Sequence, residues 1–138
     1  MRLILLTFIT ANLLGCASWQ NQNKEKSLLY MQLGISQIDG EDYPNALKSL
    51  LEAEKLDSTN PVIQNNLGLT YFLRERYDLA EKHLTKAVNL DPKYSDARNN
   101  LARVLIEQTK YVAAEKELKI VLNDLTYSGF AKDRKSVV

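Results

Sequence analysis

The fold is decided by residues 61–94, which read PVIQNNLGLTYFLRERYDLAEKHLTKAVNLDPKY. When this stretch is aligned with the stretches of equal length before and after it, similar residues coincide. The aligned sets are Leu33, Leu67 and Leu101; Gly34, Gly68 and Ala102; Tyr43, Tyr77 and Tyr111; Ala46, Ala80 and Ala114; Lys48, Lys82 and Lys116; Leu50, Leu84 and Leu118; Ala53, Ala87 and Val121. A fixed period of this length is typical of stacked repeats. We therefore predict three units, at 27–60, 61–94 and 95–128.

Each unit is predicted to contain two helices, because its apolar residues recur at helical spacing. Asn60 before Pro61 has the pattern of an N-cap followed by a first helical residue. Asp91 and Pro92 are expected to end a helix, and Ser95 to cap the next one. The predicted first helices are 27–39, 61–73 and 95–107, and the predicted second helices are 43–56, 76–90 and 110–124.

Small residues recur where the two helices of a unit must approach closely. Gly34 and Gly68 occupy equivalent places in predicted first helices, and Ala102 occupies the third. A glycine inside a helix costs about 1 kcal/mol relative to alanine, so two at equivalent places indicate a packing requirement. The sequence predicts that a larger side chain at Gly68 would overfill the contact with the second helix.

The middle unit resembles the tetratricopeptide repeat, a 34-residue helix–turn–helix, in Leu67-Gly68, Tyr71, Ala80, Leu84, Ala87 and Pro92. The flanking units depart from it where Ser58 and Thr126 replace the proline. The resemblance implies an all-α protein, a right-handed solenoid of about three repeats. Residues 129–138 are predicted to be a tail or the start of a further helix.

The N-terminus has the pattern of a secretion signal, predicted at residues 1–15. Arg2 precedes an apolar run over 3–14, which is shorter than the roughly 20 residues that a membrane span needs. The run ends in Leu13-Leu14-Gly15-Cys16, which resembles the lipobox of bacterial lipoproteins. The resemblance implies that Cys16 carries the lipid, which is the predicted membrane attachment.

Residues 16–26 are predicted to be the lipidated cysteine and a tether, since residues 17–25 are polar and lack periodicity. Ala17 follows the cysteine, where aspartate would retain an enterobacterial lipoprotein in the inner membrane. We therefore expect the outer membrane, on its periplasmic face. A plain cleaved signal peptide and a buried first helix are the alternative interpretations.

Composition argues against several function classes. Lys and Arg number 18 and Asp and Glu 17, a formal charge of +1, which gives no basic excess for nucleic acid. One cysteine and one histidine are too few for an ordinary zinc site. His83 is predicted to lie on the surface, and Glu115 to Glu117 on a solvated face. We predict no catalytic residues, metal, cofactor or small-molecule substrate, and hence no enzyme.

The resemblance implies that the first helices line a groove that binds a protein partner. The residues expected to face it include Leu28, Ile38, Val62, Asp96 and Ile106, and the predicted binding site consists of Met31, Ile35, Asn65, Asn66, Leu69, Phe72, Asn99, Asn100 and Arg103. Packing within the stack is the alternative for the apolar residues, and bonding to solvent or to the next repeat is the alternative for the asparagines. A charge at Asn65 or Asn99 is expected to weaken binding without unfolding the protein.

One mode of peptide binding is predicted to be absent. Met31 and Ile35 occupy two places of the basic clamp with which some chaperone-binding arrays hold a C-terminal carboxylate. A peptide is therefore expected to be bound mainly through shape and apolar contact. The asparagines offer both donors and acceptors to its backbone.

A lipobox followed by such repeats resembles the type IV pilus biogenesis lipoproteins, the pilotins of the pilus secretin. The stretches NNLGLTYF at 65–72 and YSDARNNLA at 94–102 carry this resemblance. It implies a partner that is an outer-membrane secretin subunit, localised and assembled with help from this chain. The alternative is another cell-envelope scaffold lipoprotein, one that organises peptidoglycan or division proteins.

Overall fold

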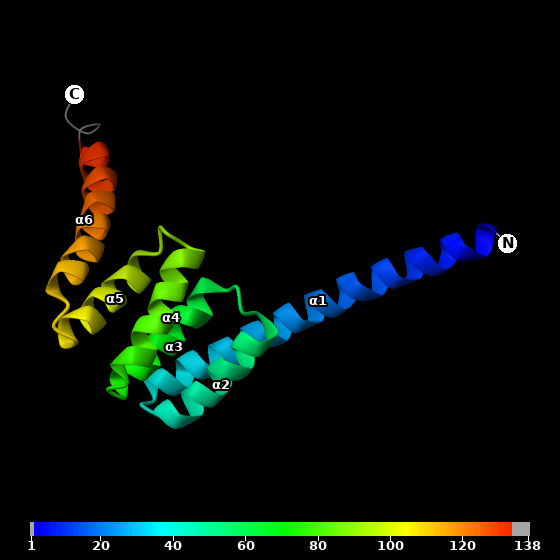
Figure 1. Cartoon of the computed structure of the whole chain (residues 1–138), viewed down its shortest axis with the longest axis horizontal. Coiled ribbons are helices and arrows are strands. Elements are labelled where there is room, and N and C mark those ends of the chain that lie inside the picture. Colours follow the sequence, from blue (N-terminus) through cyan, green and yellow to red (C-terminus); the bar gives the residue numbers. More distant parts are fainter. Residues whose placement is uncertain (1, 134–138) are drawn as a thin grey trace. The chain divides into compact units, whose positions relative to one another are not determined.

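The computed structural model describes the backbone of residues 2–133 and the side chains of residues 20–123. The chain divides into two compact units, residues 1–58 and residues 59–138. Six helices account for the regular structure of the described residues: α1 (Arg2–Asp39), α2 (Tyr43–Leu56), α3 (Pro61–Leu73), α4 (Tyr77–Leu90), α5 (Ser95–Glu107) and α6 (Tyr111–Asp133). Within the units, α1 packs on α2, α3 on α4, and α5 on both α4 and α6 (Figure 1). This is the predicted all-α helical-repeat fold.

The bounds of α2, α3 and α5 agree with the prediction, and α4 begins one residue later than expected. The predicted start of the first helix near residue 27 was wrong, because α1 begins at Arg2 and continues through the expected tether. Residues 17–33 contain no Gly or Pro, so a helix in this part of the chain has nothing to end it. None of the helices among the described residues is long and apolar enough to cross a membrane.

The predicted end of the last helix was also too early. The helix α6 continues past residue 124 to Asp133, so residues 129–133 extend it rather than form a tail or a further helix. The rest of that predicted segment, 134–138, lies outside the described residues. The side chain of Cys16 lies outside them too, and its lipidation stays a prediction.

Two of the three predicted signals for helix ends are confirmed. The Asn60 side chain accepts a hydrogen bond from the backbone N–H of Val62 at 2.9 Å, as an N-cap should. The helix α4 ends at Leu90, before Asp91 and Pro92, as predicted. Ser95 was wrongly predicted as a cap. It is the first residue of α5, and its hydroxyl donates to the Lys93 carbonyl at 3.5 Å.

The first helix of every pair ends in the same hydrogen-bonded turn. In α3 the N–H of Glu75 bonds to the Phe72 carbonyl and the N–H of Arg76 to the Tyr71 carbonyl, which is the Schellman arrangement. The same two bonds recur one repeat earlier and one repeat later. Glu41, Glu75 and Thr109 therefore all have positive φ, at 59°, 58° and 60°. This conformation suits glycine, and it is least suited to a β-branched residue such as Thr109.

Close helix approach is achieved by pairing each glycine with a leucine across its hairpin. A Cβ atom added at Gly34 would lie 2.6 Å from Leu50 Cγ, and one at Gly68 would lie 2.5 Å from Leu84 Cγ. Both leucines are fully buried. In the third pair, Ala102 already carries that Cβ, and its partner Leu118 is 36% exposed. The predicted packing role of the two glycines is thus confirmed, and the third hairpin is packed less tightly at this point.

We expect Thr109→Gly to raise the free energy of unfolding by about 1 kcal/mol, since glycine adopts positive φ without steric cost. Urea denaturation followed by circular dichroism measures the change. The control is Thr85→Gly on the exposed side of α4, which should lower stability by about 0.5 kcal/mol. A loss of stability in both variants would contradict the strain assigned to Thr109.

Gly68→Ala should lower the free energy of unfolding by about 1–3 kcal/mol, because its methyl group collides with Leu84. The matched variant is Gly40→Ala, whose new Cβ would meet only backbone oxygens, the nearest at 3.5 Å. That variant should stay within about 0.5 kcal/mol of the unchanged protein. Equal effects of the two substitutions in thermal unfolding would rule out the glycine–leucine contact as the cause.

Candidate functional site

The predicted binding residues all lie on α1, α3 and α5, the first helices of the three pairs. Two of these helices, α3 and α5, belong to the same unit and contact each other. We call their shared surface the α3–α5 face, and it consists of Asn65, Asn66, Leu69, Phe72, Asn99, Asn100, Arg103 and Ile106. Four of them, Asn65, Phe72, Asn100 and Arg103, are joined in one network of contacts.

Asn65 is the centre of the polar part of the face, and it is only 6% exposed. Its side-chain Nδ2 donates to the Tyr94 hydroxyl at 3.3 Å, and its Oδ1 accepts from Asn100 Nδ2 at 3.0 Å. A tyrosine hydroxyl is protonated at neutral pH, and burial raises the pKa of Tyr94 further above its ordinary value. Asn65 therefore joins α3 to α5. For this residue, bonding to the next repeat is the correct interpretation.

The two remaining asparagines differ from this pair. Asn66 is half-buried, and its Nδ2 donates to the Val62 carbonyl on its own helix at 2.8 Å. Asn99 is exposed on α5. Asn99 is thus the asparagine best placed to meet a partner, whereas a charge at Asn65 would be buried. The expectation that Asn65 could be charged without harm to folding does not fit this burial.

Arg103 lies where the polar part of the face meets its apolar part. Its guanidinium carbon lies 4.7 Å from the centre of the Phe72 ring, and its Nη1 is 3.5 Å from Asn100 Oδ1. Ile106 follows one turn along α5 and is 43% exposed, while Leu69 and Phe72 on α3 are half-buried. Contacts therefore run without interruption from Tyr94 through the asparagines to Arg103 and Phe72.

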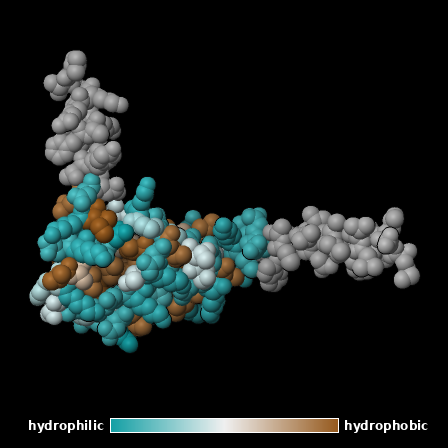
Figure 2. All heavy atoms as spheres, turned by 45° about the horizontal axis from the view of Figure 1, so that its top comes forward, coloured by the Kyte–Doolittle hydropathy of each residue, from teal (hydrophilic) through white to brown (hydrophobic). Residues whose placement is uncertain are grey.

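The predicted binding residues of α1 belong to the other unit. Met31 and Ile35 are half-buried, as is Ile38, whereas Leu28 is 43% exposed. On α1 they lie on either side of Gly34, where the helix meets α2. Figure 2 shows apolar and hydrophilic side chains mixed over the surface that it draws. These residues contribute both to packing and to the surface.

His83 was wrongly predicted as a surface residue. It is 9% exposed, its Nδ1 lies 2.9 Å from Gln64 Oε1, and its ring stacks on Tyr71 with the centroids 5.4 Å apart. The equivalent positions of the next repeat hold Arg98 and Glu117, which form an ion pair. Glu117 is thus not on a solvated face either. The repeat could have indicated both contacts, because residues 98 and 117 lie one repeat after residues 64 and 83.

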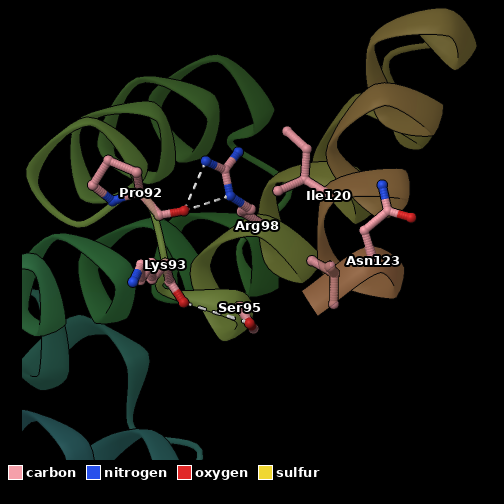
Figure 3. Close-up of a pocket in the computed structure, with 7 residues that line it drawn as sticks. Pro92, Lys93, Ser95, Arg98, Ile120 and Asn123 are labelled. Atoms are coloured by element: carbon pink, nitrogen blue, oxygen red, sulfur yellow. Dashed lines mark hydrogen bonds between the residues drawn. The ribbon is translucent and has the colours of Figure 1, made fainter. Parts of the chain in front are cut away.

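A pocket of about 360 Å³, which the sequence did not predict, opens between the start of α5 and α6. Figure 3 shows that the Arg98 guanidinium turns toward the loop before α5, where its Nε and Nη2 donate to the Pro92 carbonyl at 2.9 and 2.8 Å. The remaining lining residues are Lys93, Ser95, Ile120, Val121 and Asn123. Because Arg98 is already bonded to the Pro92 carbonyl and to Glu117, its main role in this pocket is to hold the start of α5 against the neighbouring loop and α6.

The described side chains offer no evident metal centre. Among them, no group of three or more His, Cys, Asp or Glu is placed to hold a metal ion. What these side chains form instead is a surface with hydrogen-bonding groups at one end and apolar groups at the other. Such a surface is suited to binding a peptide or another protein.

Two family models of the tetratricopeptide repeat (TPR) match parts of the chain. The tetratricopeptide repeat matches residues 71–125, and the TPR repeat matches residues 37–73. Together these matches extend from the end of α1 into α6. No curated protein sequence shows significant similarity to the chain.

Several solved structures have the same fold. The TPR domain of Arabidopsis OM64 has a TM-score of 0.73 at 22% identity, covering 83% of this chain and 94% of that one. The second TPR of Spaghetti (RPAP3), bound to the HSP90 peptide SRMEEVD, has a TM-score of 0.71 at 25% identity, covering 73% and 94%. Pseudomonas aeruginosa pilF has a TM-score of 0.70 at 24% identity, and the alignment covers 77% of this chain but only 48% of pilF.

Asn65→Ala should lower the free energy of unfolding by about 1–3 kcal/mol, since it removes a buried side chain and leaves the half-buried polar groups of Tyr94 and Asn100 without this partner. Asn99→Ala removes the same side chain from an exposed position and should change stability by less than about 0.5 kcal/mol. Both values are measured by urea denaturation. Equal stability of the two variants would show that Asn65 does not join the helices.

Proposed function

Because the chain belongs to the tetratricopeptide repeat family, whose domains generally bind other proteins, we propose that it is a lipid-anchored scaffold for secretin assembly. In this proposal it helps type IV pilus secretin subunits to reach the outer membrane and to assemble there. The observation that carries the binding role is the α3–α5 face, where Asn99, Arg103 and Ile106 are exposed on one helix. The proposal assigns no chemical reaction to the chain.

The anchor in this proposal is Cys16. Its support is the order Leu13-Leu14-Gly15-Cys16, in which the thiol would receive the lipid and the small Gly15 would fit the peptidase. A single acyl chain binds a membrane only marginally, so multiple acylation is needed for stable attachment. Ala17 after the cysteine supports the outer membrane as the destination.

The secretin partner is supported by resemblance to the pilotins in residues 65–72 and 94–102. The fold is also that of Pseudomonas aeruginosa pilF. The chain spans about half of the pilF chain, so the activity of the longer protein is here a proposal. Another envelope scaffold, organising peptidoglycan or division proteins, would use the same face and the same anchor.

The test is the amount of assembled pilus secretin in outer membranes, measured by immunoblot after membrane fractionation. We expect multimers to vanish when the gene is deleted and to accumulate away from the outer membrane with Cys16→Ala, because the lipid supplies the transport. Ser18→Ala, a similarly small change two residues from the anchor, is the matched control and should leave the multimers in place.

Each result leads to a distinct conclusion. If multimers are unchanged on deletion, the secretin role is wrong and the other envelope scaffold becomes the leading hypothesis. If deletion removes the multimers but Cys16→Ala leaves them in the outer membrane, the scaffold role stands without the lipid. Incorporation of radiolabelled fatty acid into the protein, and its loss in Cys16→Ala, tests the anchor independently of the partner.

A further inference from the structure

The α3–α5 face includes one charged residue, Arg103, and acidic residues lie on α5 to either side of it. The helix α3, residues 61–73, contains no acidic or basic side chain. On the facing side of α5, Asp96 lies near the start, Arg103 in the middle, and Glu107 at the end, beyond Ile106. The other arginine of α5, Arg98, is buried and paired with Glu117. Arg103 is therefore the cation that a molecule lying across the middle of the face would meet.

The surroundings of Arg103 hold its guanidinium in place. The Phe72 ring lies under the guanidinium at 4.7 Å, and Asn100 Oδ1 lies 3.5 Å from Nη1. Asn100 is itself held by its bond to Asn65. The contact to Asn100 is long, and Arg103 is exposed, so its remaining donors can reach a ligand. A guanidinium stacked on an aromatic ring is well suited to bind a carboxylate with two parallel hydrogen bonds.

The apolar residues of the α3–α5 face lie near Arg103 along the two helices. Ile106 lies three residues further along α5, and Phe72 and Leu69 lie on α3. We propose that Arg103 binds a carboxylate of the partner protein, in a segment where Asp or Glu stands next to an aliphatic residue. The aliphatic side chain rests on Phe72 and Ile106, and Asn99 is available to the segment's backbone. This inference deepens the proposed function and rests on it for the role of the face.

Neighbouring acidic groups restrict where this carboxylate can lie. Glu107 is one turn beyond Arg103. It ends α5 and lines a pocket together with Tyr77 and Asp78 at the start of α4. Asp96 lies about two turns before Arg103. A carboxylate near either end of α5 would be repelled, so the attraction is confined to the middle of the face. An acidic run along the whole segment is therefore disfavoured relative to a single Asp or Glu.

The experiment is a selection of random peptides displayed on phage against the full chain carrying no change, Arg103→Glu, or Arg103→Lys. The matched control is Lys82→Glu, which reverses an exposed charge on α4, outside the α3–α5 face. We expect the unchanged chain and the Lys82 variant to enrich peptides with Asp or Glu beside Leu, Ile or Val. Arg103→Glu should lose these sequences and enrich Lys or Arg instead.

The strongest enriched peptide is then synthesised in two forms, with its Glu or Asp intact or replaced by Gln or Asn. Isothermal titration should show about tenfold weaker binding for the amide form and about tenfold weaker binding to Arg103→Glu. Arg103→Lys should weaken binding severalfold, because lysine lacks the planar fork. Phe72→Leu should have a similar effect by removing the surface on which the guanidinium rests. Circular dichroism confirms that each variant keeps its helices.

The outcomes separate this inference from the proposed function. Peptides that bind equally well to the Arg103→Glu chain, or without any preference for Asp or Glu, would overturn the role of Arg103 and leave a protein-binding face. Failure of every peptide to bind would overturn the inference and remove the support for peptide binding at this face. The secretin measurement above is independent of both results, since it depends on the gene rather than on a peptide.

Discussion

The rest of the structure depends on the contact between a glycine and a leucine within a helical pair. Gly34 faces Leu50, and Gly68 faces Leu84, at separations that leave no space for a β-carbon. The two helix backbones can approach closely there, and the leucine side chain fills the remaining volume, which removes apolar surface from water. Ala102 replaces the glycine in the third pair, and its leucine is partly exposed. The third pair therefore lacks the glycine–leucine contact of the other two.

A second consequence of the repeat is a buried polar position in each pair, filled by a different chemistry each time. Ser49 bonds to Gln37, His83 lies against Gln64 and Tyr71, and Glu117 pairs with Arg98. Ser49, His83 and Glu117 occupy equivalent positions of the repeat on the three second helices. Buried polar groups need partners, so the first helix supplies one in every case. These contacts fix the rotation of one helix against the other, which apolar packing alone leaves less specific.

On the α3–α5 face, some asparagines hold the two helices together, and another is exposed and available to a partner. Asn65 and Asn100 bond to each other between the helices, and Tyr94 adds a third member. Asn99 remains exposed, and Arg103 is held by Phe72 and Asn100. The network that joins the two helices is therefore the same one that positions the exposed cation. A rigid support of this kind reduces the entropy lost when a partner is bound.

The sequence by itself determined the helical pairs, because period, caps and small residues are local signals: the bounds of α2, α3 and α5 and the cap at Asn60 followed from it. It could not determine where α1 begins, since residues 17–33 contain no Gly or Pro that would mark a boundary. It could not determine where α6 ends either, since a single glycine, Gly129, does not stop a helix. Nor could it distinguish Asn65 from Asn99, or show that His83 is buried. Those assignments depend on which side chain of a neighbouring helix each residue contacts. Only the tertiary structure decides that, because hydrogen bonds between helices join residues that are distant in the chain.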